Sequence, residues 1–197
     1  MVTILYFVRH ARSDVSVRDE RSRPLTPDGL EKAKEVARLF EKEAITAVWS
    51  SPYKRSVQTV MDAAEAVGLE IHTDEDFRER RVEAGWIEDF KAFSLRQWSN
   101  FEFHLDGGEC LREVQERNVA ALHRVLDQNP GGRVLVGSHG TALSTIVRFH
   151  EPGFGYEEFW TIIDRMPWIV RFRFDGHAFL DMEEIRLPGV EGIRVPR

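Results

Sequence analysis

The feature that most constrains the fold is a pair of short apolar runs, each followed by a histidine. Residues 2–8 are rich in β-branched and aromatic side chains and lead into Arg9 and His10. Residues 133–137 form a similar run that leads into His139. Such runs are typical of strands buried on both faces of a parallel sheet. A single histidine after a strand is usually structural, but ligands of open α/β sheets bind beyond the carboxyl ends of strands. Two histidines at such positions therefore predict a functional site.

Strand and helix patterns alternate along the rest of the chain. Thr26 and Pro27 form a helix-start signal, because threonine caps a helix well and proline fits its first position. Asp175-Gly176 is a hairpin turn signal. The alternation predicts an α/β fold: a three-layer α/β/α sandwich with a mostly parallel sheet, helices on both faces and a C-terminal hairpin at one edge. The other expected strands are 44–51, 70–73, 168–174 and 178–185; the other expected helices are 52–67, 109–127, 141–149 and one or two between 74 and 108.

Composition excludes several classes of protein. The 197 residues carry 27 basic and 33 acidic side chains, a net charge of −6, whereas a nonspecific nucleic-acid binder would be basic. No apolar run reaches the length of about 18 residues that a membrane span needs, and the N-terminal run lacks the basic residues of a signal peptide. Cys110 is the only cysteine, which excludes an intramolecular disulfide. We therefore expect a cytoplasmic protein with neither nucleic acid nor membrane as partner.

A third strand end adds an anion-binding signal. The strand expected at 44–51 ends in Ser-Ser-Pro, and Arg55 follows in the first turn of the next helix. Backbone N–H groups there favour an anion, and the planar fork of arginine binds phosphate through two bonds. Five arginines also lie from Arg9 to Arg23. A bias toward arginine would explain the number, but Arg9 beside His10 favours a local anion site.

The ordered motifs resemble those of the histidine phosphatase superfamily, also called the phosphoglycerate mutase-like family. Residues 7–11 read F-V-R-H-A, similar to the Arg-His-Gly signature that follows the first strand. Further matches, in family order over roughly residues 3–145, are L-T-P-D-G-L at 25–30, S-S-P-Y-K-R-S-V-Q-T at 50–59, F-R-E-R at 77–80, G-G-E-C at 107–110 and V-G-S-H-G at 136–140. The resemblance implies a single domain over residues 1–197, with an aromatic-rich insertion at about 80–108 over the active site.

The resemblance also implies catalysis through a phosphohistidine. His10 would attack phosphorus with one ring nitrogen, while a backbone carbonyl orients the other. Arg9, Arg55 and His139 would surround the phosphoryl oxygens and stabilise charge in the transition state. Glu79, from F-R-E-R, would protonate the leaving alcohol and then help to activate water.

No metal or other cofactor is implied, because arginines and histidines take its place. Binding of a metal by His10 and His139 is disfavoured, since no carboxylate or cysteine stands near them at ligand spacing. Glu83 is the alternative to Glu79 as the acid, and a solvated charge run is the ordinary interpretation of this segment. The F-R-E-R match favours Glu79.

Four positions depart from the family pattern. Arg12 stands where many members have glutamate. Ala11 replaces the usual glycine. Ser16 stands near a usual phosphate-contacting asparagine, so we assign phosphate binding to Ser16, with Ser13 as the alternative. Cys110 replaces a common serine in G-G-E-S, and we expect a structural rather than a reactive thiol. Glu109 is expected in the first turn of the helix that follows.

The preferred activity is that of a phosphatase acting on a small phosphorylated substrate, because the chain has the length of the shorter phosphatase branch. A mutase, which is an isomerase, is the alternative, and a binding member directed at phosphoproteins is a third possibility. Exposed edges would allow a homodimer. Rim aromatics favour a substrate with an apolar or ring-bearing part, whereas a second anionic group would suit the arginines at 12, 18, 21 and 23; the two features point to different substrates.

Overall fold

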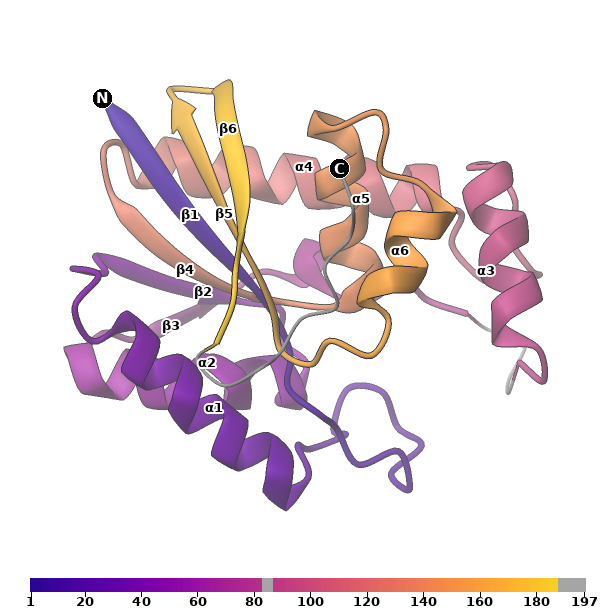
Figure 1. The fold of residues 1–197 in the computed structure, drawn as a ribbon, viewed down its shortest axis with the longest axis horizontal. Coiled ribbons are helices and arrows are strands. Elements are labelled where there is room, and N and C mark those ends of the chain that lie inside the picture. The colour runs from indigo at the N-terminus through magenta and orange to yellow at the C-terminus, as the bar shows by residue number, and fades with distance from the viewer. Residues whose placement is uncertain (83–86, 188–197) are drawn as a thin grey trace.

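A computed structural model describes residues 1–82 and 87–187 of the chain. Six strands form one mixed sheet in the order β3-β2-β4-β1-β5-β6, with helices on both faces (Figure 1). The strands are β1 (Val2–Arg9), β2 (Ala47–Ser50), β3 (Ile71–Thr73), β4 (Arg133–Ser138), β5 (Trp168–Asp175) and β6 (Ala178–Ile185). The helices are α1 (Pro27–Phe40), α2 (Lys54–Val67), α3 (Phe90–Ser99), α4 (Leu111–Gln128), α5 (Gly140–His150) and α6 (Tyr156–Ile162), with a 3-10 turn, η1, at Glu75–Phe77.

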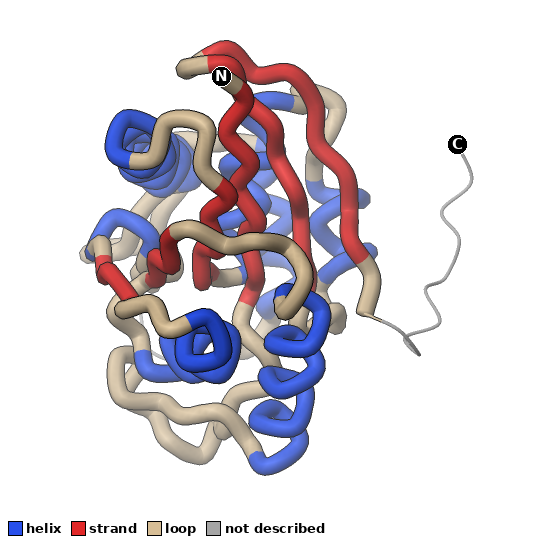
Figure 2. Tube along the Cα trace, turned by 90° about the vertical axis from the view of Figure 1, so that its left-hand side faces the viewer, coloured by secondary structure: helices blue, strands red, loops and turns tan. Residues whose placement is uncertain are grey.

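The central strand β1 shows why the molecule has three layers. Successive side chains of a strand point to opposite faces, and both faces of β1 are apolar. Leu5 and Phe7 pack in a core that includes side chains of α4 and α5. Tyr6 and Val8 pack in a second core with side chains of α1 and α2. The predicted α/β/α sandwich is confirmed, and Figure 2 shows helices on either side of the sheet.

The directions of the strands place the carboxyl ends of β1 to β4 on the same side of the sheet. β1, β2, β3 and β4 are mutually parallel, whereas β5 runs antiparallel to β1. β6 pairs antiparallel with β5 as the predicted hairpin and so points the same way as β1. Because β1, β2 and β4 are adjacent and parallel, the residues that follow them converge.

Helix boundaries follow local chemistry, with two differences from the sequence analysis. Thr26 caps α1 by accepting a hydrogen bond from the backbone N–H of Gly29, and Gly68 ends α2 in the left-handed conformation at φ 67°. Helix α4 begins at Leu111, so Glu109 precedes the helix instead of lying in its first turn. Helix α6 was not predicted.

The aromatic segment before α4 contains a single α-helix, α3, in its described part. Phe93 and Trp98 on this helix are buried, and Trp98 packs against Phe159 of α6 with ring centroids 5.3 Å apart. These aromatics therefore extend the core beyond the sheet, between α6 and α3. Helix α3 lies at the right-hand end of the molecule in Figure 1. Trp86 lies outside the described residues.

Candidate active site

His10 and His139 lie side by side beyond the ends of β1 and β4. The register of the two strands places Arg9 opposite Ser138, and the backbone N–H of His10 donates to the Ser138 carbonyl at 3.0 Å. The centroids of the two imidazole rings are 5.3 Å apart. Strand pairing thus brings together two histidines that are far apart in the sequence.

The His10 ring is held as a neutral base. Nδ1 lies 2.7 Å from the carbonyl oxygen of Ala11, which can only accept a hydrogen bond, so Nδ1 carries the ring proton. Burial and the nearby cations Arg55 and Arg9 keep the pKa of His10 well below the ordinary histidine value. The lone pair on Nε2 therefore stays free for attack on an electrophile.

The turn after His10 accommodates a methyl group where the family usually has glycine. The Ala11 side chain is fully buried in a small cluster with Leu25 and Ala33, which is a residue of α1. The backbone N–H of Ala11 donates to Oγ1 of Thr59 at 3.0 Å. The extra methyl group therefore packs against the scaffold.

Arg9 is buried and anchored from the far side of the site. Its Nη1 donates to the carbonyls of Ile162 and Ile163 at 2.8 and 2.9 Å, at the end of α6. Gly140 permits this position, because a Cβ atom on Gly140 would lie 3.1 Å from Cζ and Nε of Arg9. Burial lowers the pKa of Arg9 to about 10, so the guanidinium remains charged at neutral pH. Nε of Arg9 is buried without a hydrogen-bond partner among the described residues.

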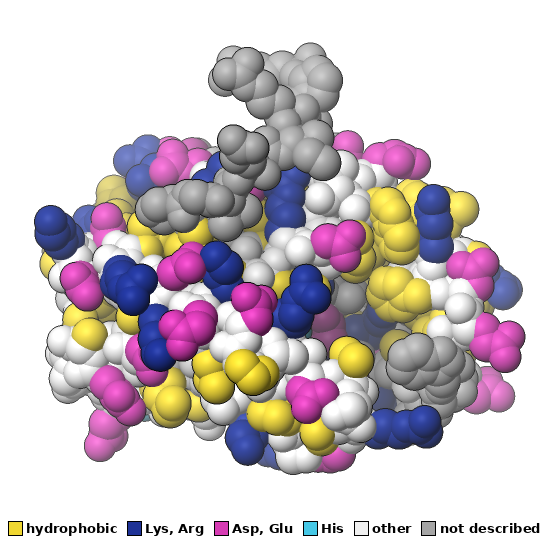
Figure 3. Space-filling view, turned by 60° about the horizontal axis from the view of Figure 1, so that its bottom comes forward, with side chains coloured by type: hydrophobic (Ala, Val, Ile, Leu, Met, Phe, Trp, Pro, Cys, Tyr) yellow, Lys and Arg dark blue, Asp and Glu magenta, His cyan; other side chains and the backbone are white. Residues whose placement is uncertain are grey.

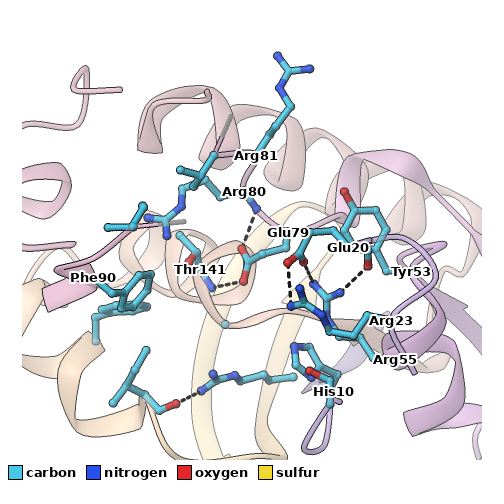
Figure 4. A pocket seen from close by; sticks show the side chains of 17 residues that line it. His10, Glu20, Arg23, Tyr53, Arg55, Glu79, Arg80, Arg81, Phe90 and Thr141 are labelled. Carbon is cyan, nitrogen blue, oxygen red and sulfur yellow. Dashed lines mark hydrogen bonds and ion pairs between the residues drawn. The ribbon is translucent and has the colours of Figure 1, made fainter. Parts of the chain in front are cut away.

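Arg55 comes from the first turn of α2 and faces the half-exposed carboxylate of Glu20. Its Nη1 donates to the Glu20 carbonyl at 2.6 Å and its Nη2 to the Glu20 carboxylate at 2.8 Å. The other carboxylate oxygen of Glu20 lies 2.7 Å from Nη1 of Arg23. Figure 4 shows Glu20 facing both arginines close to His10. Glu20 thus occupies guanidinium donors that would otherwise face an incoming anion.

His139 is fully buried behind His10. Its Nε2 lies 2.8 Å from Oγ of Ser51, which also accepts a bond from the Tyr53 backbone N–H. Nδ1 has no partner among the described residues. Burial and Arg55 keep the pKa of His139 well below the ordinary value. When Ser51 donates to Nε2, Nδ1 of the neutral ring carries an unpaired N–H donor.

Glu79 sits at the N-terminus of α5, on the opposite wall. Its carboxylate accepts hydrogen bonds from the backbone N–H groups of Arg80 at 2.8 Å, Thr141 at 3.0 Å and Ala142 at 3.2 Å (Figure 4). The positive end of the helix dipole and three N–H donors stabilise a negative charge at this position. Glu83, the alternative acid, lies outside the described residues.

Sequence reasoning did not find the side chains that hold Glu79 in place. Arg117 of α4 donates to the carbonyls of Asp76 and Arg78 at 2.7 and 2.8 Å, and its Nε lies 2.9 Å from the Glu109 carboxylate. Arg78 also pairs with Glu109 at 2.5 Å. The G-G-E-C motif contains Glu109 and was the available signal. Its placement just before α4 lets it bind two arginines and the segment that carries Glu79.

The site opens into a cavity of about 490 Å³. Ser13 lines the cavity, whereas Ser16 lies outside its lining and donates its hydroxyl to Asp14 at 2.6 Å. His139 lies behind the lining. The described lining residues are Arg9, His10, Ser13, Glu20, Arg23, Tyr53, Arg55, Glu79, Arg80, Arg81, Val82, Ile87, Phe90, Gly140, Thr141, Phe159 and Ile163.

The structure also shows the environment of the arginines in the loop after β1 and of Cys110. Of the arginines at 12, 18, 21 and 23, Arg23 lines the cavity, and Arg21 instead pairs with Glu75 at 2.6 Å. Cys110 is buried at the start of α4, and burial raises the pKa of its thiol. The thiol therefore stays protonated and unreactive at neutral pH.

Within residues 1–82 and 87–187, no group of three or more His, Cys, Asp or Glu side chains could hold a metal ion. In the same ranges, no helix is long and apolar enough to cross a membrane.

The architecture and the site define a class: an α/β protein with a neutral, carbonyl-anchored histidine among buried arginines at the strand ends. The sequence pattern of the histidine phosphatase superfamily (branch 1) matches residues 5–180, and the chain belongs to this family. It is 31% identical over 157 residues to a probable phosphoglycerate mutase, GpmB, of Salmonella typhi, covering 73% of this chain and 72% of the relative.

Solved structures share the fold at lower identity. A mycobacterial glucosyl-3-phosphoglycerate phosphatase superposes with a TM-score of 0.76 at 15% identity, covering 93% of this chain and 97% of the other. A mutant phosphoserine phosphatase of Entamoeba histolytica in complex with phosphoserine gives 0.74 at 17% identity, covering 98% and 100%. Both phosphatases and proteins named as mutases therefore resemble this chain.

Proposed function

We propose that the protein is a metal-independent phosphatase that hydrolyses a phosphomonoester through a phosphohistidine on His10. The observation that carries this proposal is the neutral His10 at the cavity next to Arg9, whose buried Nε has no hydrogen-bond partner among the described residues. Buried polar atoms normally have hydrogen-bond partners, and phosphoryl oxygens would supply them here. Arg55, which also lines the cavity, adds a second positive charge near His10.

In the first step, Nε2 of His10 attacks phosphorus and the bond from phosphorus to the ester oxygen breaks. Arg9, Arg55 and His139 stabilise the charge on the non-bridging oxygens. A protonated Glu79 gives its proton to the leaving oxygen, which departs as the alcohol.

In the second step, water attacks the phosphohistidine. Glu79, now ionised, takes one proton from the water as the new P–O bond forms and the P–N bond breaks. Inorganic phosphate leaves, and His10 regains its neutral form with the proton on Nδ1. The Ala11 carbonyl keeps the ring in the same orientation through both steps.

The test is hydrolysis of an aryl phosphate with a chelator present, by the wild type and by His10→Ala. We expect chelator-resistant turnover that falls by about 10³-fold or more in the variant. Intact mass after acid quenching should show one phosphoryl group on the wild type alone. Equal turnover by both proteins, or turnover that needs added metal, would refute the proposal.

A mutase is the second candidate, because the Salmonella typhi relative bears that name. A mutase would return the phosphoryl group from His10 to a second hydroxyl instead of to water. Phosphoryl transfer between glycerate hydroxyls faster than phosphate release would favour this reaction. A small phosphorylated substrate, a cytoplasmic location and a homodimer remain predictions.

A further inference from the structure

Part of the cavity wall is apolar, and Phe90 in this part lies across the cavity from His10 in Figure 4. The described apolar lining comes from the segment after Glu79, from α3 and from the C-terminal end of α6. These residues are Val82, Ile87, Phe90, Phe159 and Ile163. On the face shown in Figure 3, hydrophobic side chains border a hollow that has charged side chains inside it.

These side chains do more than fill the core. Phe93 and Trp98 of α3 are buried, whereas Phe90 on the same helix is 37% exposed and lines the cavity. Val82 and Ile87 are also only partly buried. Partly exposed large apolar side chains that share one concave surface usually mark a binding site.

Arg80 also lines the cavity, and it packs against the Phe90 ring of the apolar wall. Its guanidinium carbon lies 5.7 Å from the ring centroid of Phe90 and 5.0 Å from that of Phe93. Arg80 also donates to Gln97, which in turn donates to the Phe103 and Glu109 carbonyls. These contacts connect Phe90 through Arg80 to Glu109, in the cluster that positions Glu79.

The size and chemistry of the cavity define its occupant. A volume of about 490 Å³ falls in the range of pockets that bind whole organic molecules, and a phosphate group would fill only the His10 end. The remainder is bordered by the five apolar side chains, together with Arg80, Arg81 and Thr141. A polyhydroxylated leaving group would lose its bonds to water against such a surface, whereas a hydrocarbon group would gain by burial.

We propose that the physiological substrate is a phosphate monoester of an apolar alcohol, whose hydrocarbon part lies against Val82, Ile87, Phe90 and Ile163. This inference rests on the proposed phosphatase activity, and it specifies the leaving group. His10 attacks the phosphorus, and the leaving oxygen lies between Glu79 and the apolar wall.

The experiment measures kcat/KM for ethyl, butyl and hexyl phosphate, whose leaving alcohols have nearly equal basicity. Chain length then changes burial and not the chemistry of bond breaking. We expect kcat/KM to rise by about threefold to fourfold per added methylene, the factor for burial of one CH₂ group. Glycerol phosphate should be a poorer substrate than butyl phosphate.

Two variants locate the effect and one serves as control. Val82→Thr keeps the shape of the side chain but adds a hydroxyl, and Phe90→Ala removes the ring; each should reduce the dependence on chain length. Leu95→Ala removes an exposed apolar side chain of the same helix α3 that lies outside the cavity lining, and should keep the full dependence.

Failure of this inference is distinguishable from failure of the phosphatase proposal. Hydrolysis that depends on His10 but is flat or falling with chain length would overturn the inference alone. Absence of hydrolysis would overturn the phosphatase proposal, and calorimetric binding to His10→Ala would then decide the inference. Tighter binding of hexyl than of ethyl phosphate would support it, and equal binding would overturn it.

Discussion

The two ends of the cavity are built in different ways. At the His10 end, charged and titratable groups are buried and fixed by backbone atoms: the Ala11 carbonyl orients His10, and the carbonyls of Ile162 and Ile163 hold Arg9. At the other end, the lining includes partly exposed apolar side chains such as Phe90. Hydrogen-bonding groups have fixed directions, whereas apolar contact depends on area, so we expect the first end to select the bond that is broken and the second to select the molecule.

The largest expected effect comes from Glu79→Gln, which tests whether Glu79 acts as the general acid and not as a phosphate-binding group. Glu79→Gln should lower kcat by about 10²- to 10⁴-fold for an alkyl phosphate, the usual contribution of a general acid. The loss should be much smaller for an aryl phosphate, whose leaving group needs less protonation. Steady-state rates on both esters measure this, with the exposed Glu88→Gln as control. Equal losses on the two esters would assign Glu79 a structural role.

Protonation should weaken the His10 end and leave the apolar end untouched. His10 and His139 have lowered pKa values when folded, so below pH 6.5 the unfolded chain binds more protons than the folded one. The free energy of unfolding that depends on neutral His10 and His139 is fully present above pH 6.5 and is lost as the pH falls. Each imidazole should remove about 1.4 kcal/mol of unfolding free energy per pH unit.

Urea denaturation at pH 7.0, 6.0 and 5.0 would measure this slope. Burial also lowers the pKa of His150, to about 4, so it adds to the same trend. His10→Asn should reduce the slope by the share of one imidazole. A stability that stays constant across this interval would show that the imidazoles are protonated in the folded protein.

The anchoring of Arg9 can be disturbed without removing any functional group. Gly140→Ala would place a Cβ atom 3.1 Å from Cζ and Nε of Arg9 and force the guanidinium to shift. We expect kcat/KM to fall by about 10- to 100-fold, since small displacements of positioning groups are costly. Gly153→Ala is the matched control, because its Cβ would meet nothing within 4 Å. Similar rates for both variants would contradict the anchoring role of Gly140.

The smallest expected effect concerns the Glu20 carboxylate, which pairs with Arg55 at the His10 end. Glu20→Gln removes a negative charge from Arg55 and Arg23, and should tighten inorganic phosphate or vanadate inhibition by about threefold to tenfold. Glu75→Gln disrupts a comparable exposed ion pair, with Arg21, outside the cavity lining, and should leave inhibition unchanged. Weaker inhibition in Glu20→Gln would mean that Glu20 chiefly positions Arg55.

Much of the His10 end could be predicted, because its residues follow strand ends that can be identified from runs of apolar residues in the sequence. Arg9, His10, Arg55 and His139 all lie at the end of the sheet where they were expected, as does Glu79 beside α5. Ser16 is the exception, since its loop turns the hydroxyl toward Asp14 and places Ser13 at the cavity. Loop conformation depends on packing of distant segments, which periodicity does not record.

The apolar end was much less predictable. Rim aromatics were expected, but the sequence did not say which side chains of the 74–108 segment they would be. Phe93 is buried and packs against Phe103, whereas the more exposed Phe90 contacts Trp160 of α6, a helix that was not predicted. Tertiary contact alone decides which face of α3 is buried.

By itself, the sequence determined the alternating elements, the family and the candidate residues of the site, because strand periodicity and motif order are local properties of the chain. Tertiary structure decided what those residues face. Glu20 reaches Arg55 across the chain, Glu109 binds Arg117 behind Glu79, and α6 closes the cavity around Arg9. Hydrogen bonds and burial act at contact range, so these relations exist only once distant segments have packed together.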